Sequence, residues 1–313
     1  MTAPGAALVR FVAEELARPV PAAVSTFAAE LAARGGQGVV GILFYGSALR
    51  TGATDGLLDF YVLLDRLEAW DASPLLRFGA RHLPPNVEYA ETTAAGMTLR
   101  SKLAVMTLGQ FRRHARHQSR DTTIWARFAQ PSALAWSRDA FAAQAVAEAV
   151  AVAVRGAAWW AAHLGPEKGS AAGFWSALFS RTYSSELRVE GASRPGSIVE
   201  AAPDRYDAAL RLAWAAEGIA FRDDLGELSP AIGRQARADA ERAWRARKRL
   251  AKPLNLLRLA KAAFSFSGGA DYIAWKIERH SGHKIEVTPF QRRHPLLAAG
   301  PALWRLWRKG VLR

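Results

Sequence analysis

The pattern of apolar and polar positions divides the chain into a helical start, a β-rich part and a long helical remainder. Residues 5–34 repeat apolar positions at helical spacing, and prolines near position 20 break them into two amphipathic helices. Short runs rich in β-branched and aromatic residues follow, and each is short enough for a strand. These predicted strands are 39–45, 57–64, 86–93 and 102–108.

Beyond residue 108 the pattern becomes mostly helical. Residues 109–129 read as a helix that ends before Pro131, and residues 139–164 read as an alanine-rich helix. We expect a short extended piece at 181–191, a helix at 204–218 and a charged helix starting near Asp239. The prediction is an α+β protein in three parts: a mixed-sheet domain (1–135), a helical domain (136–238) and a basic C-terminal segment (239–313).

Charge is distributed very unevenly along the chain. Residues 1–230 hold 23 basic and 23 acidic residues, whereas residues 231–313 hold 19 basic and 5 acidic ones. The entire formal net charge of +14 therefore belongs to the C-terminal segment, which should meet an anionic partner. Its end, "PALWRLWRKGVLR" (301–313), mixes Trp and Leu with Arg and Lys, a composition suited to a headgroup boundary.

Two compositional facts exclude classes of function. The chain has no cysteine, so disulfides, thiolate catalysis and thiolate metal sites are ruled out. Its N-terminal stretch does not read as a signal peptide, and its longest apolar run reads as shorter than the about 20 residues needed to span a bilayer. We therefore expect a cytoplasmic protein that binds the inner membrane peripherally.

Candidate chemistry begins where the first predicted strand ends. "YGS" (45–47) follows an apolar run, and the next apolar run holds one carboxylate, Asp59. A Gly-Ser turn offers backbone N–H groups and a hydroxyl to phosphate oxygens, and a carboxylate on the next strand can hold Mg²⁺ against them. This is the layout of the nucleotidyltransferase fold. In that fold a second carboxylate usually lies two residues after the first one, on the same strand face, and this chain has Tyr61 there. The alternative interpretation of the motif is an ordinary turn followed by a structural aspartate.

Further motifs resemble one family, the mitochondrial-type phosphatidate cytidylyltransferases (the translocator assembly and maintenance family). The similar elements occur in the same order over about residues 40–270. They are "YGSA" (45–48), "LLDFYVLLD" (57–65) with Trp70 after it, "SKLAVM" (101–106), "WARFAQP" (125–131), "YSSELR" (183–188) and "KPLNLLRLAKAAFSFSGG" (252–269). The chain departs from the family at Gln130, which replaces a lysine, and at Glu186, which replaces an aspartate.

The resemblance implies a Mg²⁺-dependent CTP:phosphatidate cytidylyltransferase that forms CDP-diacylglycerol and pyrophosphate. Its partners would be CTP, phosphatidic acid and an anionic membrane surface, with no nucleic acid. The implied residues are Asp59, Lys102 and Glu186 for catalysis, with Asp59 and Glu186 as metal ligands; Tyr45, Gly46, Ser47, Arg127 and Arg188 for the nucleotide; and Arg258 and Lys261 for the lipid phosphate.

Several of these residues also have a purely structural interpretation. In that interpretation, Ser47 only caps a helix and Lys102 is a solvated strand residue. Glu186 and Arg188 then simply pair with each other. Two other functions also fit the sequence. In the first, the protein is a nucleotidyltransferase that acts on RNA or another acceptor. In the second, it is a catalytically inactive relative that only binds lipid.

Overall fold

The structure, a computed structural model, describes residues 2–54, 56–94, 97–185 and 198–265. Its helices are α1 (Ala3–Leu16), α2 (Ala22–Gly35), α3 (Ser47–Thr51), α4 (Pro74–His82), α5 (Leu108–Ala115), α6 (Thr123–Phe128), α7 (Ala140–Leu164), α8 (Ala171–Ser185), α10 (Pro203–Glu217) and α11 (Arg234–Ser265). Its strands are β1 (Val39–Tyr45), β2 (Leu57–Leu64), β3 (Asn86–Ala94), β4 (Met97–Thr107), β5 (Ser132–Ser137), β6 (Phe221–Asp224) and β7 (Glu227–Pro230).

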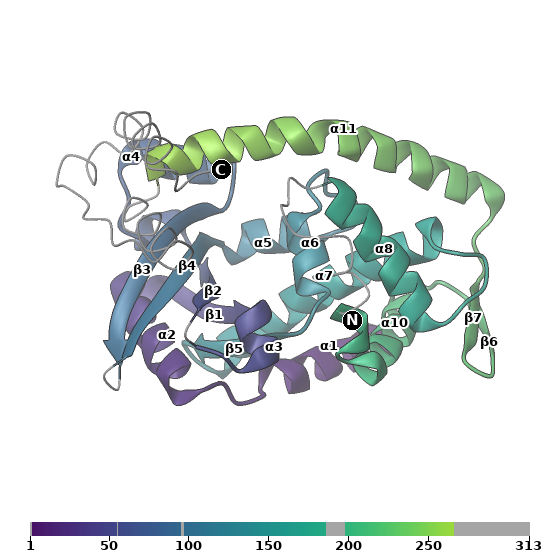
Figure 1. The fold of residues 1–313 in the computed structure, drawn as a ribbon, viewed down its shortest axis with the longest axis horizontal. Coiled ribbons are helices and arrows are strands. Elements are labelled where there is room, and N and C mark those ends of the chain that lie inside the picture. The colour runs from purple at the N-terminus through teal and green to yellow at the C-terminus, as the bar shows by residue number, and fades with distance from the viewer. Residues whose placement is uncertain (1, 55, 95–96, 186–197, 266–313) are drawn as a thin grey trace, which may run out of the picture.

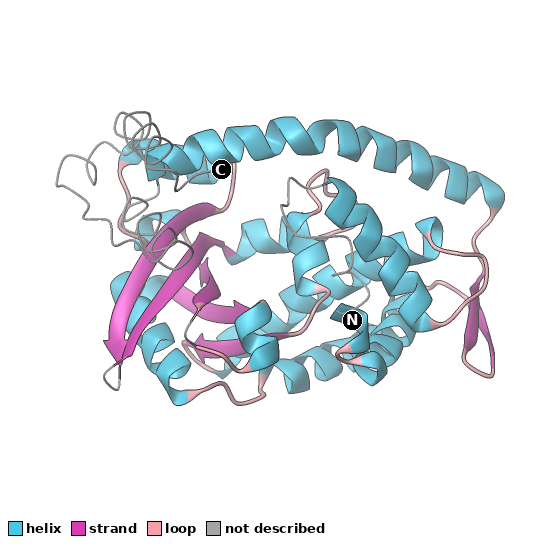
Figure 2. Ribbon diagram, in the orientation of Figure 1, coloured by secondary structure: helices cyan, strands magenta, loops and turns pink. Residues whose placement is uncertain are grey.

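A five-stranded mixed sheet forms one half of the molecule, with the strand order β3-β4-β2-β1-β5. Strands β2 and β4 are parallel, and the other neighbouring pairs are antiparallel. Figure 2 shows the sheet with helices around it, and β6 and β7 form a separate hairpin at the far end. The chain is thus a mixed α+β protein, as the sequence predicts.

Both faces of the sheet are covered, which explains why β1 and β2 are almost continuously apolar. Alternate β2 residues such as Phe60 pack with Phe27 of α2 in one hydrophobic cluster. The residues between them, Tyr61 and Leu63, belong to a second cluster that includes α5, α6 and α7. Asp59 shares this second face with Tyr61, because the two lie two residues apart on one strand.

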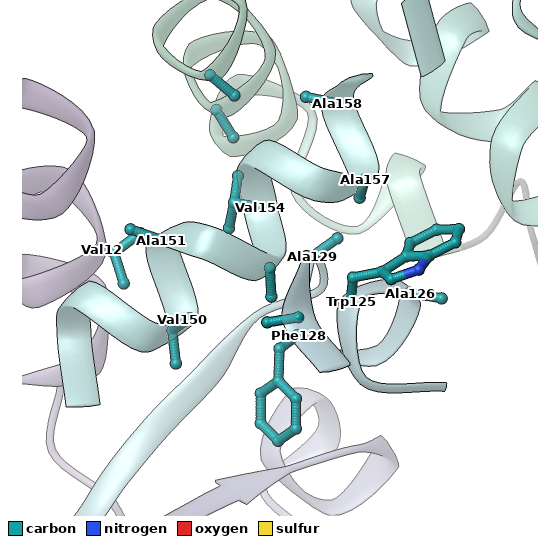
Figure 3. Packing of buried hydrophobic residues seen from close by; sticks show 14 of the residues in the cluster. Val12, Trp125, Ala126, Phe128, Ala129, Val150, Ala151, Val154, Ala157 and Ala158 are labelled. Carbon is teal, nitrogen blue, oxygen red and sulfur yellow. The ribbon is translucent and has the colours of Figure 1, made fainter. Parts of the chain in front are cut away.

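Helix α7 is the centre of the helical half. It contacts α1, α5, α6, α8 and α10, as well as β1 and β5. Figure 3 shows Trp125 and Phe128 of α6 packed beside α7, with Val12 of α1 next to Ala151. One face of the sheet and the helices around α7 therefore share a single hydrophobic cluster, while the opposite face packs against α2 in a separate one. Along the top of Figure 1, α11 runs from the hairpin to α4 and β3 and bridges both halves.

By length and hydropathy alone, the 25-residue α7 is able to cross a membrane, so the expectation that no apolar run is long enough was wrong. In the structure, however, 56% of its most apolar window is buried inside the protein. Packing against the surrounding helices explains its composition, because a helix that is apolar all round is also typical of a protein core.

Most predicted elements are confirmed, with differences at particular points. Strand β4 begins at Met97, before the predicted start, and α11 begins at Arg234. The single helix predicted at 109–129 is two helices, α5 and α6, joined by a loop. Residues 181–185 belong to α8 and are not extended, and β5 and the β6–β7 hairpin were not predicted. The proposed domain boundaries stay predictions, although β5 continues past residue 135.

A buried ion pair connects segments 190 residues apart in the sequence. Arg205 of α10 donates from Nε to Glu15 Oε2 of α1 (2.6 Å) and from Nη2 to Oε1 (3.1 Å). Its Nη1 donates to the carbonyl oxygen of Ala129, the residue that ends α6. Both charged side chains are at most 6% exposed. The guanidinium thus ties α1, α10 and the end of α6 together.

We predict that Glu15→Gln lowers the free energy of unfolding by about 3–5 kcal/mol, because it leaves the Arg205 charge buried without its counter-charge. Asp239→Asn is the matched control, since Asp239 forms an exposed pair with Arg242 of the same helix. That change should cost less than about 1 kcal/mol. Urea unfolding measures both, and equal losses in the two variants would contradict this assignment.

Candidate functional site

A row of polar side chains crosses the sheet at one level. Along the sheet order β3-β4-β2-β1-β5, the register opposes Tyr89, Lys102, Asp59, Tyr45 and Ser132 in turn. Residues directly opposite each other on neighbouring strands point to the same face. All five side chains therefore lie on the face that also carries α5, α6 and α7. The register brings together Asp59 and Lys102, predicted for catalysis, and Tyr45, predicted for nucleotide binding. Their roles stay predictions.

Burial differs among the five side chains of this row. Lys102 is exposed, Tyr89, Asp59 and Tyr45 are half-buried, and Ser132 is buried. The Tyr89 hydroxyl donates to Glu91 Oε2 at 3.0 Å. Burial, followed by this carboxylate, raises the pKa of Tyr89, so its hydroxyl stays protonated at neutral pH. A ligand would thus reach Lys102 and Asp59 more easily than Ser132.

Gly46 brings the backbone directly against Asp59. Its φ of +93° and ψ of −159° lie in a region that essentially only glycine adopts. A Cβ at this position would lie 3.0 Å from Asp59 Oδ2. The glycine therefore allows the chain to leave β1 and start α3 across the carboxylate without a clash. Ser47 is the first residue of α3, and no side chain caps this short helix.

Tyr61 and Arg127 form the inner wall of the site. The Tyr61 hydroxyl accepts a hydrogen bond of 2.9 Å from Arg127 Nη1. The guanidinium carbon lies 5.4 Å from the ring centre of Tyr45 and 5.9 Å from that of Tyr61. Phe128 packs edge-on against Tyr61, with ring centres 4.9 Å apart. Arg127, predicted as a nucleotide-binding residue, thus lies beside the tyrosine that is paired with Asp59 on β1.

Two predicted residues, Glu186 and Arg188, lie outside the described residues, so their roles stay predictions. Within the ranges that the structure describes, no three His, Cys, Asp or Glu side chains are grouped closely enough to hold a metal ion. Asp59 provides the oxygen chemistry that Mg²⁺ prefers, and its side chain is half-buried beside Gly46. Further oxygen ligands would come from phosphates, water or the segment that contains Glu186.

Arg258 and Lys261, predicted to hold a lipid phosphate, both make contacts within the protein. Arg258 forms a short ion pair with Asp121 (Nη2 to Oδ2, 2.5 Å) and donates to the Pro84 carbonyl oxygen. Lys261 donates to the carbonyl oxygens of Leu83 and Pro85. These bonds attach the end of α11 to the segment between α4 and β3. Binding of a lipid phosphate by either residue stays a prediction.

Trp70, another residue at which the sequence resembles the cytidylyltransferase family, has a packing role. Trp70 is buried, and its Nε1 donates to Glu88 Oε1 at 2.9 Å. Arg34 of α2 pairs with the same carboxylate and lies over the Trp70 ring. This contact fixes the segment after β2 against α2 and β3.

Three residues around Asp59, namely Tyr61, Tyr89 and Ser132, were not predicted as site residues. Tyr61 carried a signal in the sequence, because it lies two residues after Asp59 on one strand and must share its face. Tyr89 and Ser132 carried none, since only the register of β3 and β5 places them in the row.

A scan against models of known protein families finds no match, and a search of curated proteins finds no significantly similar sequence.

We predict that Gly46→Ala destabilises the protein more than Gly52→Ala. Gly52 also has a positive φ, +72°, but nothing lies within 4 Å of a Cβ built there, so its change should cost roughly 1–2 kcal/mol. At Gly46, the backbone region is more restricted and the methyl group meets the Asp59 carboxylate. Urea unfolding compares the two variants, and a smaller loss for Gly46→Ala would contradict the close approach.

Stability should also depend on the ionisation of Lys261. Burial, followed by the charge of Arg258, lowers the pKa of Lys261 from 10.5 to about 8. Between these two values the unfolded chain binds more protons than the folded one, so the Lys261 contribution to stability rises with pH in this window. Below pH 8 both states are protonated, and the cost of burying the charge is present in full.

We therefore expect wild type to gain stability relative to Lys261→Met when the pH rises from 7 to 10. Urea unfolding of both proteins at several pH values measures the difference, which removes contributions from other titrating groups. A difference that stays constant over this range would show that Lys261 has its ordinary pKa.

Proposed function

We propose that this protein is a nucleotidyltransferase, and specifically that it transfers a cytidylyl group from CTP to phosphatidate. The observation that carries the reaction class is the position of Asp59. The carboxylate lies between a Gly-Ser turn after β1 and Lys102 on the parallel strand β4. One carboxylate, one glycine turn and two cations on one face are the elements that a triphosphate and a metal need.

Each residue of the site has a role in the proposed reaction. Asp59, together with Glu186, would hold Mg²⁺, which when bound supplies positive charge against the phosphate oxygens. Gly46 and Ser47 provide the backbone turn that receives the β- and γ-phosphates. Lys102 and Arg127 neutralise the charge that develops on the transferred phosphoryl group.

The chemical step is an in-line displacement at the α-phosphorus of CTP. A phosphate oxygen of phosphatidate forms the new P–O bond, and the bond between the α-phosphorus and the bridging oxygen of pyrophosphate breaks. Because the attacking phosphate is already ionised, no general base is required, and positioning and charge neutralisation carry the rate. A site that combines one carboxylate with two cations is consistent with this demand.

The nucleobase and the acceptor are proposed from the sequence motifs and the charge distribution. CTP and phosphatidate follow from the sequence motifs that resemble the cytidylyltransferase family. An anionic acceptor agrees with the excess of basic residues after position 230. The predicted membrane-facing segment, 301–313, lies outside the described residues, so peripheral binding to the inner membrane is part of the proposal.

We predict that Asp59→Asn reduces cytidylyl transfer on the order of 100-fold or more, because the amide cannot neutralise or hold the metal. The assay combines purified protein, Mg²⁺, α-labelled CTP and phosphatidate vesicles, and it measures labelled lipid. Asp65→Asn is the matched control. Asp65 directly follows the same strand, and its carboxylate lies 3.9 Å from Arg138 and away from the row. This variant should keep wild-type activity.

The possible outcomes separate the functions. Labelled lipid from wild type and Asp65→Asn, but not from Asp59→Asn, is the expected result. Label in added RNA but not in lipid would replace the acceptor and keep the reaction class. If wild type binds the vesicles but transfers no label to either acceptor, the enzyme proposal fails and a lipid-binding function replaces it.

A further inference from the structure

Two helices of the protein expose apolar side chains that its core does not use. On α4, Leu75 is 72% exposed and Phe78 is 64% exposed, and on α11, Leu257 is 58% exposed. Single exposed apolar residues are normal on a protein surface. Here they recur at helical spacing, because Leu250, Pro253 and Leu257 are all exposed and follow each other at intervals of three and four residues.

The two helices are in contact near these residues (Figure 1). The side chain of Lys261 passes so close to α4 that a Cβ built at Gly79 would lie 3.1 Å from its Cδ. Its Nζ also donates to the carbonyl oxygen of Leu83, just beyond the end of α4. Phe78 directly precedes Gly79, and Leu257 lies about one turn before Lys261. The exposed apolar residues of α4 and α11 therefore belong to one region, around a single helix–helix contact.

Helix α4 is attached to the sheet half through hydrogen bonds to its backbone. Gln110 Nε2 of α5 donates to the carbonyl oxygen of Ala80 at 2.8 Å. Asn86 Nδ2 of β3 donates to the carbonyl oxygen of Leu76 at 3.3 Å. The helix thus keeps its place without burying its exposed apolar side chains, so these can contact a partner without any rearrangement of the fold.

Around these apolar side chains, the charged residues of both helices are basic. Helix α4 contains Arg77, Arg81 and His82 and no acidic residue. Of these, Arg81 pairs with Glu68, which is itself exposed. In α11, the stretch 242–261 holds eight basic residues and again no acidic one. Exposed leucine and phenylalanine among arginine and lysine are typical of a surface that lies between lipid headgroups and acyl chains.

The charge also distinguishes among possible partners. The chain after α11, residues 266–313, holds nine basic and three acidic residues, so its charge does not complement this surface. A second copy of the chain would bring the same basic face to an isologous contact. A nucleic acid would neutralise the charge but leave the leucines in water, since leucine has no ring on which a base can stack. An anionic lipid bilayer satisfies both the basic and the apolar residues.

We infer that residues 74–82 and 242–258 (the α4–α11 surface) bind an anionic lipid bilayer, with Leu75, Phe78 and Leu257 inserted among the headgroups. The basic residues attract the headgroups, and the apolar side chains add affinity in proportion to the area that they bury. This surface is separate from the segment 301–313 that the proposed function assigns to the membrane, and its lipid binding does not depend on nucleotidyl transfer.

Insertion can be tested at single positions, because the chain has no cysteine of its own to label. Leu75→Cys carrying a nitrobenzoxadiazole fluorophore should shift its emission to the blue when vesicles of phosphatidylcholine and phosphatidylglycerol are added without CTP. Phe141→Cys is the matched control, because Phe141 is 89% exposed at the start of α7, close to the acidic Asp139. Its label should keep the emission it has in water. Equal shifts at both positions, or no shift at position 75, would overturn the inference.

Cosedimentation with the same vesicles measures the contribution of the apolar side chains. Phe78→Ser should weaken binding roughly 10-fold, because the ring can no longer leave water for the bilayer. Phe141→Ser removes an equally exposed ring elsewhere and should bind like wild type. Equal binding by Phe78→Ser and wild type would contradict insertion of α4.

The charge contribution needs a control with the same change in net charge. Replacement of Lys248 and Arg249 of α11 by glutamine should weaken binding to the anionic vesicles roughly 30-fold. Replacement of Arg10 and Arg18, which are exposed at α1 and just after it, should weaken it much less. Equal losses in the two double variants would show that only the net charge matters and would overturn the inference.

The remaining outcomes identify other occupants or separate this binding from catalysis. If wild type binds no anionic vesicles, or binds RNA in their place, the inference is overturned. Sedimentation that shows a dimer of wild type but a monomer of Phe78→Ser would make a second copy the occupant and also overturn it. If wild type binds vesicles through the α4–α11 surface but transfers no cytidylyl group, the proposed function fails and the lipid-binding surface stands.

Discussion

The buried ion pair between Glu15 and Arg205 is the contact on which the rest of the structure depends. It joins the first helix to α10 and, through the Ala129 carbonyl oxygen, fixes the end of α6. Because α6 carries Arg127, the same contact sets the distance between the helical half and the polar row on the sheet. The cost of burying two charges is offset only when every bond is made, so these elements must assemble together.

The strand register of the sheet fixes the face on which Asp59 lies. A shift of one residue would turn Asp59 to the opposite face, among Phe27 and the other apolar residues beneath α2. The apolar residues on both sides of Asp59 on β2 make such a shift costly, because both faces are buried. The carboxylate is thus held at the edge of the covered surface, beside Gly46, where a charged ligand can reach it.

Several arginines connect elements that are far apart in the sequence. The Arg258 guanidinium compensates the buried Asp121 carboxylate and donates to the Pro84 carbonyl oxygen, so it fixes α11 to the segment before β3. Arg127 of α6 donates to the Tyr61 hydroxyl of β2 and so connects the helical half to the sheet. These contacts show that basic residues hold the fold together as well as contributing to its net charge.

Local sequence was sufficient for β1, β2, the helices on either side of residue 20 and α7. Short apolar runs rich in β-branched and aromatic residues specified the strands, and longer runs with helical spacing or high alanine content specified the helices. It also singled out Gly46 and Asp59, since a glycine turn followed by a lone carboxylate in an apolar strand is visible in the letters. The short strand β5, the break between α5 and α6, the hydrogen bond from Arg127 to Tyr61 and the row from Tyr89 to Ser132 depended on tertiary structure alone. Strand pairing and packing bring together residues far apart in the chain, and no local pattern records which of them will meet.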